Sequence, residues 1–167
     1  MLFFFLSLGL LTPATEEPSI AEFPRTLGVF DIVPSKFAPK MSVSACYARH
    51  HNQYLLLQRR SDGIWGVPGG KLEEGESPFN AIFREFFEET GIMLKQDFVK
   101  FIKTVYISDP KKDFVFHIYV YDFEEKPGVI LSKEHQSYIW KTLEEYTELP
   151  LIWGEQEVFE KYITNLK

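Results

Sequence analysis

The stretch Gly70–Ile92, GKLEEGESPFNAIFREFFEETGI, tells more about this chain than any other part of it. Within it, six glutamates stand against two basic residues, so the segment holds two thirds of the chain's net charge of −6. A helix that faces water on its polar side normally intersperses charges of both signs. This concentration of carboxylates therefore needs a physical reason.

Helical end signals bracket the segment. Ser77 is a residue type that caps helix N-termini, and Pro78 suits the first helical position. Gly91 suits the position just after a helix ends, where the backbone often turns left-handed. The spacing of these residues predicts a helix over 78–90.

The predicted helix has an apolar and an acidic face. Its apolar residues recur at three- and four-residue steps and predict one apolar stripe: Phe79, Ile82, Phe83, Phe86 and Phe87. Glu85, Glu88 and Glu89 share the opposite face. Two such charges about 4 Å apart repel by about 4 kcal/mol at an effective dielectric near 20. We therefore expect a hard cation among them, Mg²⁺ or Mn²⁺, with a fully hydrated acidic face as the alternative.

The residues around the helix favour the cation. Pro68-Gly69-Gly70 precede it, and glycine lets a backbone carbonyl approach an ion or a substrate closely. Arg84 adjoins Glu85, and its planar guanidinium can hold a carboxylate in place.

The complete pattern resembles the signature of the Nudix hydrolases. Gly70 is followed after five residues by Glu76, and after seven more by Arg84-Glu85-Phe86-Phe87-Glu88-Glu89-Thr90-Gly91-Ile92. Similar surroundings extend the resemblance over about residues 41–165. It implies an α/β fold, a Nudix-type α/β/α sandwich with a mixed sheet and the motif as loop–helix–loop. It also implies hydrolysis of a diphosphate bond in a nucleoside diphosphate linked to another group.

The resemblance suggests roles for individual residues. The metal ligands are expected to be Gly69, through its carbonyl, Glu85, Glu88 and Glu89. Glu85, Arg84 and Glu134 are the candidate catalytic residues, although Glu134 could equally be an exposed loop glutamate. Gly70, Glu76 and Gly91 are expected to be structural, with Glu76 paired to Arg84. For the substrate, Arg59 or Arg60 could clamp a phosphate and Trp65 could stack on a base.

The substrate class is the least determined feature. The plain sequence flanking the motif is most similar to nucleoside triphosphate pyrophosphohydrolases. Dinucleoside polyphosphates and nucleotide sugars are the alternative substrates. A non-catalytic nucleotide-binding module is disfavoured, because such relatives usually lack glutamates that this chain retains.

Outside the motif, strands and helices alternate. Strands are expected over Thr26–Val33, Ser42–His50 and Tyr54–Gln58, near 99–107 and 113–122, and around Tyr138–Trp140. Short helices are expected near 143–145 and over 155–164. Interleaved elements of this kind predict a mixed sheet flanked by helices.

Length and composition limit the remaining possibilities. A chain of 167 residues suits one domain, expected over 41–167 behind an N-terminal extension, 1–40. The net charge of −6 argues against nucleic acid as a partner, and one cysteine excludes an internal disulfide. We expect a monomer or a homodimer.

The first residues bear on localisation. The apolar run over residues 2–11 is too short for stable membrane insertion, which takes about 20 residues. Residues 1–14 have the length of a signal-peptide core but lack its positive flank, so we expect a cytoplasmic protein, with export as the alternative.

Overall fold

The computed structural model describes residues 25–164 and 166, so the signal-like segment, 1–14, lies outside the described residues. The strands are β1 (Gly28–Phe30), β2 (Pro39–His50), β3 (Gln53–Arg59), β4 (Trp65–Gly66), β5 (Gly69–Lys71), β6 (Lys100–Ser108), β7 (Asp113–Asp122) and β8 (His135–Lys141). The helices are α1 (Pro78–Thr90), α2 (Leu143–Tyr146) and α3 (Glu155–Val158). A 3₁₀ turn spans Gln96–Phe98, and a π-helical segment, Phe159–Ile163, continues α3.

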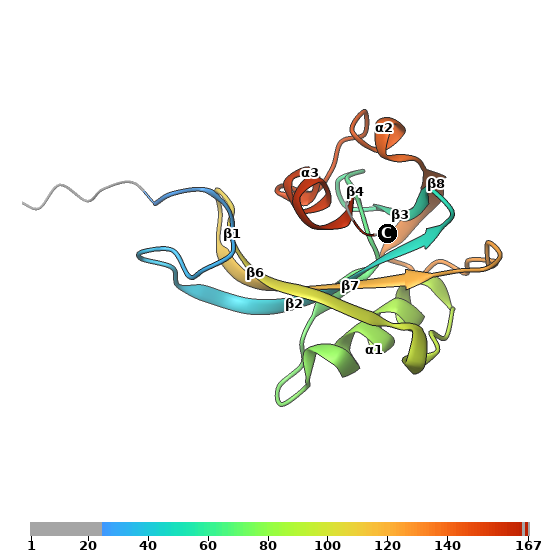
Figure 1. Ribbon diagram of the computed structural model, residues 1–167, viewed down its shortest axis with the longest axis horizontal. Helices are drawn as coiled ribbons and strands as arrows, with labels where there is room; N and C mark the ends of the chain where they lie inside the picture. The colour runs from blue at the N-terminus through green and yellow to red at the C-terminus, as the bar shows by residue number, and fades with distance from the viewer. Residues whose placement is uncertain (1–24, 165, 167) are drawn as a thin grey trace, which may run out of the picture.

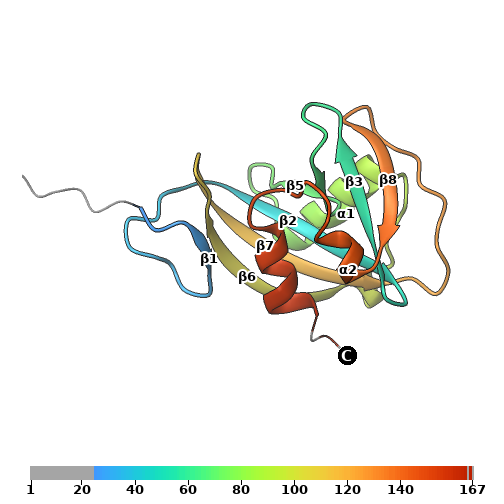
Figure 2. The ribbon, with the colours of Figure 1, turned by 90° about the horizontal axis from the view of Figure 1, so that it is seen from above.

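The strands form one mixed sheet between two helical layers. Its order is β1-β6-β7-β2-β3-β4, with β5 attached to β2 and β8 to β3. β2 and β7 run parallel, and the other pairs are antiparallel. α1 covers one face of the sheet, and α2 and α3 lie over the other (Figure 1). Seen from above, β3 and β8 lie side by side (Figure 2). The expected α/β sandwich is confirmed.

The sheet is buried on both faces. Successive residues of a strand pack alternately on one face and on the other, as two central strands show. Cys46 and Leu55 pack in the apolar cluster under α1. The next residue of each strand, Tyr47 and Leu56, packs in the cluster under α3. All four are fully buried, because successive side chains of a strand point to opposite faces. The central strands therefore support both layers at once.

Helix α1 begins and ends as predicted. The Ser77 hydroxyl accepts a hydrogen bond from the Asn80 amide at 3.1 Å, and Pro78 opens the first turn. Gly91 adopts φ 70°, and its amide donates to the Phe87 carbonyl at 2.8 Å. A side chain would be strained at this φ, which explains the glycine.

The predicted apolar stripe of α1 is buried only in part. Ile82 and Phe86 are fully buried, whereas Phe79 and Phe87 are 38% and 50% exposed. Ile82 and Phe86 belong to the buried cluster between α1 and the sheet, and Phe83 packs partly buried against it. Phe79 instead packs edge-on against Phe83 at the margin of the helix.

Other predicted elements need smaller corrections. The C-terminal helix is α-helical only over Glu155–Val158 before it becomes π-helical. The predicted domain boundary at residue 41 falls inside β2, and β1 already pairs with β6, so part of the expected extension is built into the sheet. Among the described residues, no helix has the length and apolar character needed to cross a membrane.

Candidate active site

Arg84 stands at the centre of the acidic motif. Its Nε and Nη2 donate to the two carboxylate oxygens of Glu76 at 2.9 and 2.8 Å, so the predicted ion pair is present. Its Nη1 donates to Glu85 at 2.9 Å and to Glu88 at 3.3 Å, and Nη2 reaches the Lys71 carbonyl at 2.9 Å. The hydrogen bonds from Arg84 hold the pKa of Glu76 below its usual value. Arg84 thereby ties the loop after β5 to helix α1.

Gly70 lies directly against the Glu85 carboxylate. A Cβ built on Gly70 would overlap the carboxylate carbon and both oxygens of Glu85. Burial raises the pKa of Glu85, and Arg84 acts in the opposite direction. Because Gly70 has no side chain, the Glu85 carboxylate of α1 can pack directly against β5.

Glu89 is the most buried carboxylate of the motif. Its Oε2 accepts a hydrogen bond from the Gly69 amide at 2.8 Å. Burial raises its pKa to about 8; the Gly69 amide lowers it, while the charges of Glu85, Glu134 and Glu88 raise it further. Burial and the neighbouring carboxylates thus both disfavour the charged form of Glu89.

The predicted metal ligands do not converge on one point. Arg84 holds Glu85 and Glu88, and the Gly69 amide holds Glu89. In the described part of the chain, no group of three or more histidine, cysteine, aspartate or glutamate side chains has an arrangement that could hold a metal. The donor chemistry nevertheless fits a hard cation, because these oxygen donors repel one another and the single positive charge of Arg84 is shared among Glu76, Glu85 and Glu88.

The loop before β8 brings Glu134 to this cluster. Glu134 is exposed, and its charge contributes to the raised pKa of both Glu85 and Glu89 after burial. The Glu134 carbonyl accepts from the Arg60 amide at 2.8 Å. The Arg60 guanidinium donates to the carbonyls of Lys133 and His135 at 3.2 and 3.1 Å. Arg60 therefore braces the loop that carries Glu134, and its planar group is already occupied.

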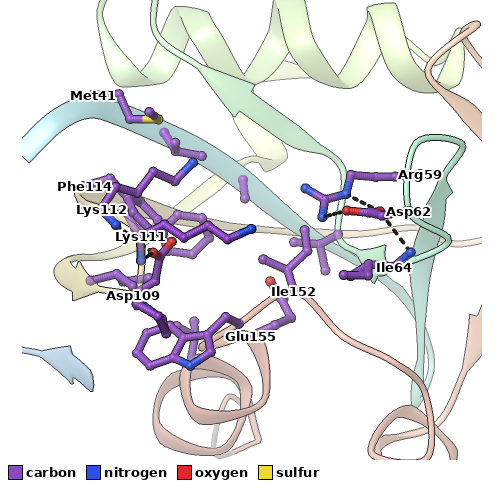
Figure 3. A pocket seen from close by; sticks show the side chains of 18 residues that line it. Met41, Arg59, Asp62, Ile64, Asp109, Lys111, Lys112, Phe114, Ile152 and Glu155 are labelled. Atoms are coloured by element: carbon purple, nitrogen blue, oxygen red, sulfur yellow. Dashed lines mark hydrogen bonds and ion pairs between the residues drawn. The ribbon is translucent and has the colours of Figure 1, made fainter. Parts of the chain in front are cut away.

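A cavity of about 410 Å³ lies on the other face of β2 from α1 (Figure 3). Its walls are largely apolar, from β2, β7, the link between β4 and β5, and the segment ahead of α3: Met41, Val43, Val67, Phe114, Phe116 and Ile152. Arg59 lines it beside Asp62, to which it is bound at 2.6 Å. Trp65, expected to stack on a base, is instead buried in the core under α3.

Backbone pairs of the sheet connect the cavity with the residues that hold the carboxylates on the α1 side. Ala45 lines it and pairs with Gly69, whose amide holds Glu89. Arg59 also lines it and pairs with His135, whose Nε2 is 3.7 Å from a Glu89 oxygen. The cavity and the carboxylate cluster are thus separated by one pair of neighbouring residues on the sheet, and no glutamate of the motif lines the cavity itself.

Two residues at the site were missed as candidates. His135 is buried against Glu89, and burial lowers its pKa, which favours the neutral ring. Its place directly after Glu134 was the available signal. Glu155 lines the cavity and is 6% exposed. The sequence marks it only as one of three glutamates in the expected C-terminal helix.

Replacing Arg84 by lysine should lower the free energy of unfolding by about 2–3 kcal/mol, because one ammonium cannot reproduce this set of charge-assisted hydrogen bonds. Urea denaturation measures the change. As a control, Arg59→Lys alters an exposed ion pair with Asp62 and should change stability by less than about 1 kcal/mol. Equal midpoints for wild type and Arg84→Lys would contradict the bracing role.

The comparisons with known proteins agree on one family. A family model described as "NUDIX domain" matches residues 38–162. The chain is 30% identical over 121 residues to the uncharacterized Nudix hydrolase YvcI of Bacillus subtilis, covering 71% of this chain and 76% of that protein. It is 28% identical over 132 residues to the CTP pyrophosphohydrolase of Escherichia coli, covering 74% and 91%.

A solved structure shows the same fold. The MutT protein of Methanosarcina mazei superposes with a TM-score of 0.64 at 26% identity, covering 74% of this chain and 92% of that one. The matched region of the family model includes the whole motif Gly70–Ile92, helices α1, α2 and α3, and every strand of the sheet except β1. The chain therefore belongs to the Nudix hydrolase family.

Proposed function

We propose that this enzyme is a Mg²⁺-dependent pyrophosphohydrolase of nucleoside triphosphates. The observation that carries the proposal is the crowded carboxylate cluster of the motif, in which the charges of Glu85, Glu134 and Glu88 add to the burial of Glu89; a largely apolar cavity lies one strand pair away. Such a cavity has the size typical of small-molecule sites, about 300–1,000 Å³. The base would lie in the cavity and the phosphates beside Glu85 and Glu89.

The cation is needed for electrostatic reasons. A polyphosphate is strongly anionic, and the carboxylates of Glu85, Glu88 and Glu89 would repel it. These three side chains and the Gly69 carbonyl are the groups that would hold Mg²⁺, with Mn²⁺ as an alternative. When bound, the cation would offset phosphate charge and lower the pKa of a nearby water.

The chain's own residues would divide the remaining work. Arg84 keeps Glu85 oriented, since it donates to its carboxylate at 2.9 Å. Glu134 is the candidate general base, because its loop places its charge beside the cluster. It would take a proton from water as the water oxygen bonds to phosphorus and the anhydride P–O bond breaks. The products would be a nucleoside monophosphate and pyrophosphate.

A nucleotide panel with and without metal tests this proposal. We expect turnover with Mg²⁺ to be strongest for a nucleoside triphosphate and to fall to background in a chelator, since the carboxylates then repel the substrate. Pyrophosphate release and chromatography of the nucleotides measure it. Undiminished turnover in the chelator would contradict the metal role.

The same panel separates the alternatives. Faster cleavage of a dinucleoside polyphosphate or a nucleotide sugar would reassign the substrate. Binding of nucleotides without cleavage of any of them under every metal condition would indicate a non-catalytic module.

A further inference from the structure

His135 faces the most buried carboxylate of the motif. Its ring is buried, and its Nε2 lies 3.7 Å from Oε1 of Glu89. At the other oxygen of the same carboxylate, the Gly69 amide donates to Oε2 at 2.8 Å. Glu89 therefore lies between an amide of β5 and the first residue of β8, which are far apart in sequence.

The segment ahead of β8 is fixed to the end of helix α1. The Ser132 amide donates to the Glu89 carbonyl at 3.2 Å. On its other side, the segment leads directly into β8, where His135 pairs with Arg59 of β3. Backbone contacts to the helix and to the sheet therefore set the position of the His135 ring relative to Glu89.

A short chain of hydrogen bonds orients the imidazole. The Ser132 hydroxyl oxygen accepts from the Glu134 amide at 3.3 Å and lies 3.3 Å from Nδ1 of His135, so its hydrogen can point to Nδ1. Burial lowers the pKa of the ring and favours its neutral form, in which the nitrogen that does not accept carries the hydrogen. The opposite tautomer would turn a lone pair of Nε2 toward an ionised carboxylate, which is repulsive. Nε2 therefore presents an N–H to Glu89.

These contacts leave Glu89 able to bind a cation. The two oxygens of an ionised carboxylate together offer about four acceptor sites, so one contact to each oxygen leaves a site on both. A neutral imidazole orients the carboxylate without cancelling its charge, as an arginine or a lysine would. Groups that hold a metal ligand in its binding orientation typically change metal affinity or activity about 10- to 100-fold.

We propose that His135 is a positioning residue that acts through Glu89. Its Nε2–H holds the Glu89 carboxylate in the orientation in which the motif binds a divalent cation. Through Ser132, the same ring couples this ligand to the loop that carries Glu134. The inference rests on the proposed function and adds to it a residue that touches neither the substrate nor the cation.

Titration of the full chain with Mn²⁺ in the absence of nucleotide, followed by electron paramagnetic resonance, tests the inference. His135→Leu keeps much of the bulk of the ring but removes the N–H, so the affinity for Mn²⁺ should fall about 10-fold. His135→Gln restores an N–H donor and should bind Mn²⁺ within about threefold of the wild type. Equal affinity of the wild type and His135→Leu would overturn the inference, and so would an equal loss in both variants.

His50→Leu is the matched control. His50 also contacts a backbone oxygen through Nδ1, the Phe123 carbonyl at 3.2 Å. It pairs with Gln53 at the start of β3, whereas His135 pairs with Arg59 at the end of that strand. His50→Leu should therefore keep the wild-type affinity for Mn²⁺. A loss as large as that in His135→Leu would overturn the assignment to His135.

Hydrolysis assays keep this inference distinct from the proposed function. An affinity for Mn²⁺ that depends on His135, in a protein that cleaves no nucleotide, would support the inference and overturn the function. Metal-dependent cleavage of nucleoside triphosphates, with Mn²⁺ affinity unchanged in His135→Leu, would do the reverse. A wild type that binds no Mn²⁺ would overturn both.

Discussion

Replacing Glu89 by glutamine should lower kcat for the best nucleotide substrate by about 1000-fold while leaving the fold intact. The loss follows because a neutral amide no longer helps to hold a cation against the phosphates, and several kcal/mol of transition-state stabilisation goes with it. Glutamine still offers an oxygen to the Gly69 amide, which donates to Glu89 at 2.8 Å. Steady-state kinetics with Mg²⁺ and thermal unfolding without metal measure the two effects.

Glu89→Gln should not lower the thermal stability of the protein in the absence of metal. Burial raises the pKa of Glu89 to about 8, so the folded protein disfavours the charged form. A neutral glutamine should therefore unfold in metal-free buffer at a temperature equal to or above that of the wild type. The exposed Glu74, in the loop between β5 and α1, provides the matched control, and Glu74→Gln should keep near-wild-type kcat. Near-wild-type turnover in Glu89→Gln would remove this residue from the mechanism.

Gly70→Ala should reduce kcat/KM by about 100-fold, although it adds only one methyl group. The new Cβ would overlap the Glu85 carboxylate, so Glu85 has to move away from β5 and from its bond to Arg84. A displacement of about 1 Å at a reacting centre can cost about 100-fold in rate. Kinetics with Mg²⁺ measure the loss, and circular dichroism checks that the strand is retained.

Gly128→Ala is the control for the added methyl group. Gly128 is exposed and has no heavy atom within 4 Å of a built Cβ, so this change should leave kcat/KM unchanged. If Gly70→Ala were as active as Gly128→Ala, the close packing of β5 on Glu85 would not be needed for activity.

The sequence predicted the elements well where local signals were strong. Helix α1 has its predicted bounds because Ser77, Pro78 and Gly91 mark its ends through contacts within a few residues. Strand β7 was also placed correctly, since it is a long run of apolar and aromatic residues. The short strands β4 and β5 were missed, because they depend on pairing with β3 and β2 and have little local pattern.

In the candidate site, too, some contacts could be predicted from the sequence and others depend on the fold. The ion pair between Glu76 and Arg84 could be anticipated from the motif, and the structure confirms it. The contact of Gly70 with Glu85 could not, because it requires β5 to be packed on α1. Arg60 was a candidate phosphate clamp, yet the fold uses its guanidinium to hold the loop that carries Glu134.

The amino-acid sequence alone determined the family, the acidic helix and its caps, because these depend on residue types at fixed separations along the chain. The tertiary structure alone decided which side chains meet across the sheet. It placed the cavity on the face away from α1 and brought Glu155 to it from near the C-terminal end. Such contacts join residues far apart in sequence, and they form only when buried apolar surface brings the layers together.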